Sequence, residues 1–93
     1  PALALTQKVI ERARRAGLPA DLIPGDLLVI TLSEDVDAEN ALRAEALEFM
    51  DTVRAAEKTV AAARRQAPES LDGLGDEPVG AITEAEWRAA WPG

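Results

Sequence analysis

Residues 37 to 66 read DAENALRAEALEFMDTVRAAEKTVAAARRQ, and this stretch decides the fold. Its apolar side chains recur at alternating steps of four and three residues: Leu42, Ala46, Phe49, Val53, Ala56, Val60 and Ala63. That spacing holds them on one side of an α-helix for about three heptads. The stretch therefore predicts a long central helix over about 37–66, with one apolar seam that packs against other helices.

Acidic residues precede this helix and recur along it. Asp35 or Asp37 suits the N-cap position, and acids in a first turn match the helix dipole. Farther along, Glu45, Glu48 and Asp51 stand three residues apart and so lie close together on the helix surface. They form either a solvated acidic face or a site for a divalent metal ion. We favour the solvated face, because like charges at this spacing repel one another unless water surrounds them.

A second helix is expected upstream, over residues 3–16. Its apolar residues fall on one side, and Lys8, Arg12 and Arg15 form a basic stripe along another. Gly17 follows and is expected to end the helix, as a C-terminal glycine commonly does. We interpret the basic stripe as a solvated face near the acidic residues that precede the long helix.

The segment between these two helices contains a continuous apolar run, Leu-Leu-Val-Ile-Thr-Leu, at residues 27–32. Its β-branched residues would suit a buried strand. A lone strand, however, would have nothing to pair with in a chain whose other segments favour helix. We therefore predict a short buried helix over residues 27–32.

Residues 67–81 are rich in proline, glycine and acidic residues, a composition that buries too little surface to order itself. They predict a flexible acidic linker. The chain is thus expected to consist of a helical bundle body over residues 1–66, this linker, and a short C-terminal docking helix within residues 82–93.

The C-terminal helix has a clear start signal. Thr83 suits the N-cap position, Glu86 completes a capping box, and Ile82 is placed to pack against Trp87. Trp87 and Trp91 stand one helical turn apart. A stripe of two tryptophans predicts docking onto the helical body, with a base-stacking platform as the alternative.

The composition excludes several classes of function. The chain has 93 residues, enough for one small domain, and a formal net charge of -7, which argues against a nucleic-acid surface because phosphates bind clustered Lys and Arg. It contains neither Cys nor His, so any metal site would rest on carboxylates. No apolar run approaches about 18 residues, so we expect no membrane partner and a cytoplasmic location. Many apolar residues are alanines, which predicts a thin core completed by a second chain.

Several short motifs, taken in order, resemble one known family. They are Pro1-Ala2-Leu3, Gln7-Lys8, Gly25-Asp26-Leu27-Leu28, Ala41-Leu42, Phe49 with Glu57 behind it, and Glu86-Trp87. Together they span most of the chain and resemble the C-terminal domain of MazG, a nucleoside triphosphate pyrophosphohydrolase of an all-α superfamily. The resemblance implies an all-α, MazG-like helical bundle that is completed by dimerisation.

The resemblance also implies a chemistry for the family, the hydrolysis of NTPs and dNTPs to the monophosphate and pyrophosphate. The expected active site binds Mg²⁺ through a Glu-Glu-x-x-Glu helix and a Glu-x-x-Asp pair. Carboxylates in such a site hold metal ions that bridge phosphate oxygens and activate water.

Most of these site residues are absent from the sequence. No Glu-Glu-x-x-Glu occurs, and Ile23 stands where the glutamate of the Glu-x-x-Asp pair is expected, which leaves Asp26 as a vestigial metal-ligand candidate. In the long helix, the family's phosphate-side Asn, Lys and Arg are replaced by Ala46, Glu48 and Thr52. A glutamate in place of a lysine reverses the sign of the interaction with phosphate.

Only one of the two C-terminal tryptophans matches a tryptophan of the family. Trp87 matches a late tryptophan of the family and is the one candidate substrate contact, whereas Trp91 replaces a family lysine one turn later. The sequence therefore predicts no catalytic residue and no metal bound to this segment.

Our first hypothesis is a catalytically degenerate C-terminal domain that acts in dimerisation and regulation. Mg²⁺ and catalysis would reside in an N-terminal MazG domain of the parent protein. The expected interface of the homodimer is the seam: Leu42, Ala46, Phe49, Val53, Ala56 and Val60. Two alternatives remain, a small helical module that binds another protein, and a weak Mg²⁺-dependent nucleotide hydrolase whose site is shared between subunits.

Overall fold

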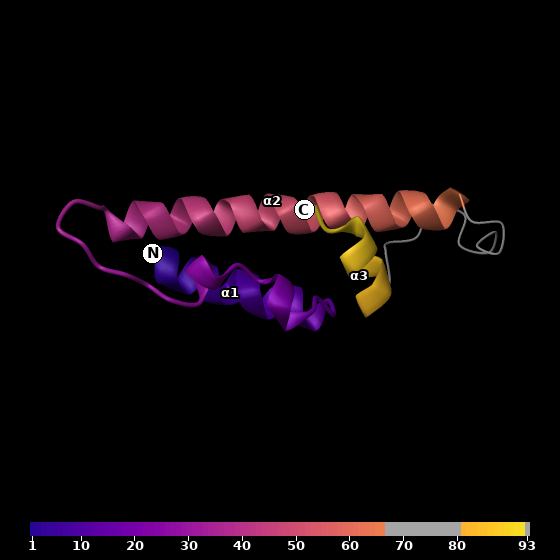
Figure 1. Cartoon of the computed structure of the whole chain (residues 1–93), viewed down its shortest axis with the longest axis horizontal. Coiled ribbons are helices and arrows are strands. Elements are labelled where there is room, and N and C mark those ends of the chain that lie inside the picture. The colour runs from indigo at the N-terminus through magenta and orange to yellow at the C-terminus, as the bar shows by residue number, and fades with distance from the viewer. Residues whose placement is uncertain (67–80, 93) are drawn as a thin grey trace.

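The central element is one long helix, α2, which spans Ala38–Gln66 (Figure 1). The structure is a computed structural model, and it describes residues 1–66 and 81–92. Asp37 stands immediately before α2, where its Oδ1 accepts a hydrogen bond of 3.1 Å from the backbone N–H of Asn40. This bond satisfies one of the donors that a helix N-terminus leaves unpaired. The predicted long helix and its acidic start are both confirmed.

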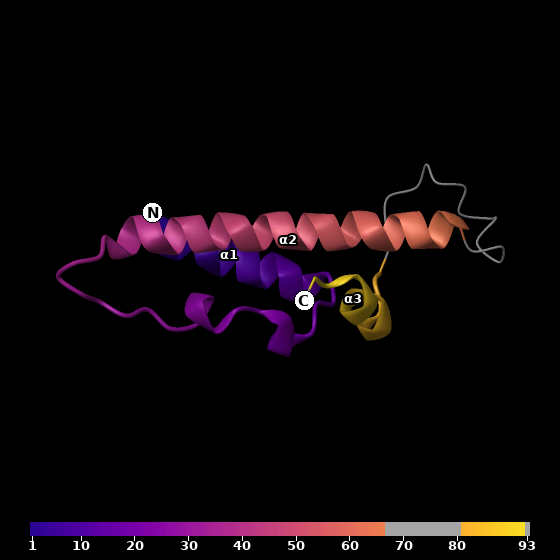
Figure 2. The ribbon, with the colours of Figure 1, turned by 45° about the horizontal axis from the view of Figure 1, so that its top comes forward.

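The predicted N-terminal helix is also confirmed, as α1, Ala2–Arg15. It runs beside the first half of α2 and in the same direction (Figures 1 and 2). Small side chains, those of Ala2, Thr6 and Ala13, are buried on α1, which lets the two helices approach closely. The start of α1 is tied to α2 by a hydrogen bond of 2.6 Å from the backbone N–H of Ala2 to Glu39 Oε1.

Because α1 and α2 run in the same direction, the segment that connects them must run back from the end of α1 to the start of α2 (Figure 1). We call this segment the return. This return contains two short 3-10 turns, η1 (Ala20–Leu22) and η2 (Gly25–Leu27). Ile23 and Leu27 reach from it into the core and are 6% and 5% exposed.

The prediction of a short buried helix over residues 27–32 is wrong. The 3-10 turn η2 ends at Leu27, and residues 29–33 form neither helix nor strand. The side chains from Leu28 to Leu32 are exposed, with Leu32 at 80%. The run is apolar as a buried element would be, but no other described part of the chain lies over it.

The C-terminal helix α3 spans Glu84–Ala90, and its predicted capping box is present. Thr83 Oγ1 accepts from the backbone N–H of Glu86, and the Glu86 carboxylate accepts from the backbone N–H of Thr83. Figure 2 shows α3 set across the end of α1 and against α2. The predicted short C-terminal helix is confirmed, and in the structure it packs against α2. Of the predicted linker, residues 67–80 lie outside the described residues.

The described part of the chain is entirely helices, turns and irregular segments, so the predicted all-α class is confirmed. Most of the seam of α2 lies inside the core: Val60 is 3% exposed, whereas Val53 is half-buried and Ala63 is exposed. None of the described helices is long and apolar enough to cross a membrane.

A positive φ angle at Gly17 ends α1 and makes a first prediction. Its φ is 89°, and a Cβ placed there would lie 3.0 Å from the carbonyl oxygen of Ile82. Gly17→Ala is therefore expected to lower the free energy of unfolding by about 1–3 kcal/mol. Urea unfolding measures the change.

Gly25→Ala is the matched control. No atom lies within 4 Å of the Cβ that it adds, so the expected change is about 0.4–1 kcal/mol in the stabilising direction. Equal unfolding midpoints for Gly17→Ala and Gly25→Ala would show that the close approach at Gly17 has no energetic effect.

Candidate functional site

Trp87 lies where α1, α2 and α3 meet, and it belongs to the buried core. The Trp87 side chain is 0% exposed, and its Nε1 donates a hydrogen bond of 3.2 Å to the carbonyl oxygen of Ala16. The ring of Trp91 stands edge-on to it, at a centroid distance of 6.4 Å. The family resemblance makes Trp87 the candidate substrate contact, but the structure leaves it no free face on which a base could stack.

Two arginines hold α3 in place from outside this core. Arg64 of α2 donates two hydrogen bonds of 2.8 Å to the Glu86 carboxylate, and its guanidinium also reaches the carbonyl oxygen of Ala81. Arg88 of α3 donates two bonds, of 2.8 and 2.9 Å, to the carboxylate of Asp21 in η1. Such two-pronged pairing fixes orientation as well as distance.

The sequence reasoning missed both pairs. Arg64 lies 22 residues from Glu86, and Asp21 lies 67 residues from Arg88. The capping box explained Glu86 without a second partner, and nothing in the local pattern distinguished Asp21 from the neighbouring acids.

Hydrogen bonding shifts the ionisation of these carboxylates. The bonds from Arg64, followed by that from the backbone N–H of Thr83, lower the pKa of Glu86 from 4.5 to about 2. The bonds from Arg88 likewise lower the pKa of Asp21 below its usual range. Both carboxylates favour the charged form in the folded chain.

The lowered pKa of Glu86 makes a second prediction. A group with a folded pKa below its unfolded pKa stabilises the fold above the unfolded pKa, and this contribution is lost as the pH falls through the folded pKa. Stability from Glu86 is therefore expected to be complete above about pH 4.5 and to disappear as the pH falls toward 2.

Urea unfolding between pH 2 and 7 tests this. Glu86→Gln should flatten the acid side of the stability profile, whereas Glu48→Gln, on the exposed face of α2, should leave the wild-type profile. An acid side as steep in Glu86→Gln as in the wild type would contradict the assignment.

The positions that the family resemblance assigns to the metal site are divided between core and surface. Ile23, at the place of the expected glutamate, is 6% exposed and belongs to the core. Asp26, three residues later, lies on η2 with its side chain exposed. At position 23, where the resemblance expects a second metal ligand, the structure therefore has a core isoleucine, and Asp26 has no partner ligand from that position.

The positions that the resemblance assigns to phosphate contacts lie on α2, where two of them take part in core packing or in a hydrogen bond within the helix. Ala46 is 0% exposed and packs in the core. Glu48 is exposed, and its backbone carbonyl accepts a hydrogen bond of 3.0 Å from Thr52 Oγ1. This intrahelical bond engages the Thr52 hydroxyl.

The acidic residues Glu45, Glu48 and Asp51 all lie on the exposed face of α2. Across residues 1–66 and 81–92, no three His, Cys, Asp or Glu side chains stand close enough together to hold one metal ion. The acidic face is thus a row of solvated charges in the described structure.

The seam residues, proposed above as a dimer interface, pack within the single chain. Leu42, Ala46 and Phe49 are at most 8% exposed, and Ala56 and Val60 at most 3%. Val53 is half-buried against the same core. The helices α1 and α3 cover these side chains, so a second copy would reach them only if one of those helices moved away.

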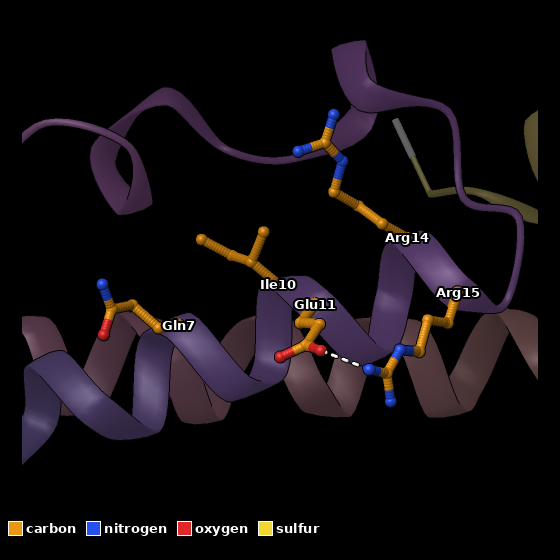
Figure 3. Close-up of a pocket in the computed structure, with 5 residues that line it drawn as sticks. All are labelled: Gln7, Ile10, Glu11, Arg14 and Arg15. Carbon is orange, nitrogen blue, oxygen red and sulfur yellow. Dashed lines mark hydrogen bonds and ion pairs between the residues drawn. The ribbon is translucent and has the colours of Figure 1, made fainter.

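An open groove with a volume of about 430 Å³ lies along the side of α1 that faces away from α2. Its lining residues are Gln7, Ile10, Glu11, Arg14 and Arg15. Figure 3 shows Gln7, Ile10 and Arg14 pointing to one side of α1, away from α2, while Glu11 and Arg15 form an ion pair in front of them. We call this feature the α1 groove.

Two known proteins match the sequence along its whole course. The chain is 57% identical, over 100% of its length, to a nucleoside triphosphate pyrophosphohydrolase of Mycolicibacterium smegmatis. It is 54% identical, over 99% of its length, to a nucleoside triphosphate pyrophosphohydrolase of Mycobacterium tuberculosis. The chain spans 28% of the length of each of these relatives.

No protein-family model matches the chain, and no solved structure matches it. The two relatives nevertheless carry the name that the short motifs suggested. The chain is therefore, by sequence, a relative of one segment of the MazG-like nucleoside triphosphate pyrophosphohydrolases.

Proposed function

We propose that this chain is the C-terminal, catalytically degenerate domain of a MazG-type nucleoside triphosphate pyrophosphohydrolase. In the parent protein, an N-terminal MazG domain would convert NTP and water to NMP and pyrophosphate in the cytoplasm. The present domain would act in dimerisation and in regulation of that activity. The high identity to two longer pyrophosphohydrolases supports the proposal.

The observation that carries it is the structural role of residues at the family's active-site positions. Ile23 and Ala46 belong to the core, where a charged or amide side chain would have to be buried. Trp91, at the place of a family lysine, lies 6.2 Å from Phe49 between ring centroids. These positions contribute packing where catalysis would require ligands and phosphate contacts.

Mg²⁺ is the cofactor that we assign to the parent protein and not to this segment. A hard divalent ion is usually held by several oxygen ligands together with substrate phosphates. Asp26 is exposed on η2, and Ile23 fills the core where its partner ligand is expected. One exposed carboxylate competes poorly with water for such an ion.

Pyrophosphate release by the purified 93-residue chain tests this proposal. With Mg²⁺ and each of the common NTPs and dNTPs, the chain is expected to release no pyrophosphate above the blank. A full-length mycobacterial relative serves as the active control.

The proposal of a degenerate site fails if release is Mg²⁺-dependent and disappears in Asp26→Asn but persists in the matched variant Asp35→Asn. That result would favour the alternative in which Asp26 and a partner subunit share a hydrolytic site.

A further inference from the structure

Seven large apolar side chains stay exposed in the described structure. They are Leu3, Leu28, Val29, Ile30, Leu32, Val36 and Leu47, each at least 47% exposed. Five of them come from residues 28–36, which we call the exposed segment. Soluble monomers rarely leave an apolar patch of this extent uncovered, so the segment has the character of an interface.

The charges around the exposed segment restrict what can cover it. Glu34 and Asp35 follow its apolar run and are exposed. Residues 21–40 carry six acids and no Lys or Arg. Two exposed segments laid directly on each other would bring acids against acids. The complementary surface must therefore place an apolar side chain next to a cation.

The α1 groove has this combination. Ile10, which is partly buried against the chain's own core, provides the apolar side chain, and Arg14 points to the same side of the helix (Figure 3). Arg14 is exposed and forms no ion pair with another residue in the described ranges, whereas Arg15 is already paired with Glu11. A cation without a partner beside an apolar surface fits an acidic segment with apolar side chains.

Within one chain, the exposed segment and the Arg14 end of α1 lie far apart. The return from α1 leads past the N-terminus of α1 to the start of α2, so its acids stand at the opposite end of α1 from the helix C-terminus that carries Arg14 (Figures 1 and 2). Two copies arranged antiparallel would bring each acidic end to the basic end of the other.

We propose that the exposed segment of one copy docks in the α1 groove of a second copy, and that the second copy returns the same contact. The apolar side chains of residues 28–32 would cover Ile10, and Glu34 and Asp35 would meet Arg14. Each copy offers both halves of the contact, so the pair closes by two-fold symmetry. This inference rests on the proposed role in dimerisation and replaces the seam with an accessible surface.

Sedimentation equilibrium of the 93-residue chain is the first test. The wild type is expected to dimerise, and Leu32→Asp should raise the dimer dissociation constant at least about tenfold. Leu32 is 80% exposed, so this change should leave the folded monomer intact, as circular dichroism would confirm. Leu47→Asp, at an exposed leucine outside the segment, is the matched control and should change the constant by less than about twofold.

A charge exchange then tests the pairing between copies. Arg14→Glu alone and the double variant Glu34→Arg with Asp35→Arg should each self-associate at least about tenfold more weakly than the wild type. Mixed together they should dimerise, because both contacts of the mixed pair again join opposite charges. Pairing within one chain could not produce this recovery.

The outcomes separate this inference from the function on which it rests. A wild-type chain that stays monomeric at all concentrations overturns both the dimerisation role and this surface, and points to another part of a longer protein as the occupant. A dimer that neither Leu32→Asp nor the charge variants weaken overturns the surface alone. A mixture that remains as weak as its components overturns the reciprocal contact.

Discussion

Replacement of Phe49 with aspartate is expected to unfold most of the chain. Phe49 is 3% exposed on α2, and its ring lies 6.2 Å from that of Trp91. Loss of a buried aromatic side chain costs about 3–5 kcal/mol, and burial of an unpaired carboxylate adds a further penalty. Small domains have only about 5–15 kcal/mol of stability, so little folded protein should remain.

Far-UV circular dichroism at neutral pH measures this effect as a loss of helical signal. Leu47→Asp, two residues away on the exposed side of the same helix, is the control and should keep the wild-type spectrum. A Phe49→Asp chain that stays folded but no longer dimerises would contradict the packing described above. It would show that the seam lies between chains.

Trp87→Ala is expected to have the next largest effect. The substitution removes a side chain that is 0% exposed and the hydrogen bond from its Nε1 to Ala16. A loss of about 3–5 kcal/mol follows from the cavity alone. At about 4–8 °C for each kcal/mol, Tm should fall by more than about 10 °C.

The loss should begin at α3. This helix has only 7 residues, and isolated helices of that length do not form in water, so it depends on its docking contacts. Urea unfolding followed by circular dichroism and by the fluorescence of Trp91 would show the weakening. Trp91→Ala, at a half-buried position, should cost less. Equal unfolding midpoints for the two variants would contradict the central position of Trp87.

The sequence predicted the elements that depend on local signals. The period of the apolar residues defined α2, Asp37 marked its start, and Gly17 marked the end of α1. Thr83 and Glu86 predicted α3 from four consecutive residues, because a capping box is completed within one helical turn.

What the local signals could not supply was the partner of each surface. Periodicity identified the seam but not its cover, and we expected a second chain where the structure places α1 and α3. The ion pairs Arg64–Glu86 and Arg88–Asp21 hold α3, and each joins residues far apart in the sequence. No local sequence pattern could therefore predict them.

The prediction of a buried helix at residues 27–32 was wrong for a related reason. Its composition matches a buried element, and we assumed that the cover lay within the same chain. The structure leaves Leu32 80% exposed, which makes the run a candidate contact surface instead of a core helix. Composition shows that a segment favours burial but not which molecule provides it.

Calorimetric titration of the purified 93-residue chain with Mg²⁺ and a non-hydrolysable nucleoside triphosphate measures whether this domain keeps a nucleotide site. Binding must precede any hydrolysis, so this measurement reports on the site itself and not on the completeness of the catalytic machinery. Because Ile23 and Ala46 lie in the core, we predict no heat beyond that of dilution. Saturable, Mg²⁺-dependent binding of the nucleotide would contradict it.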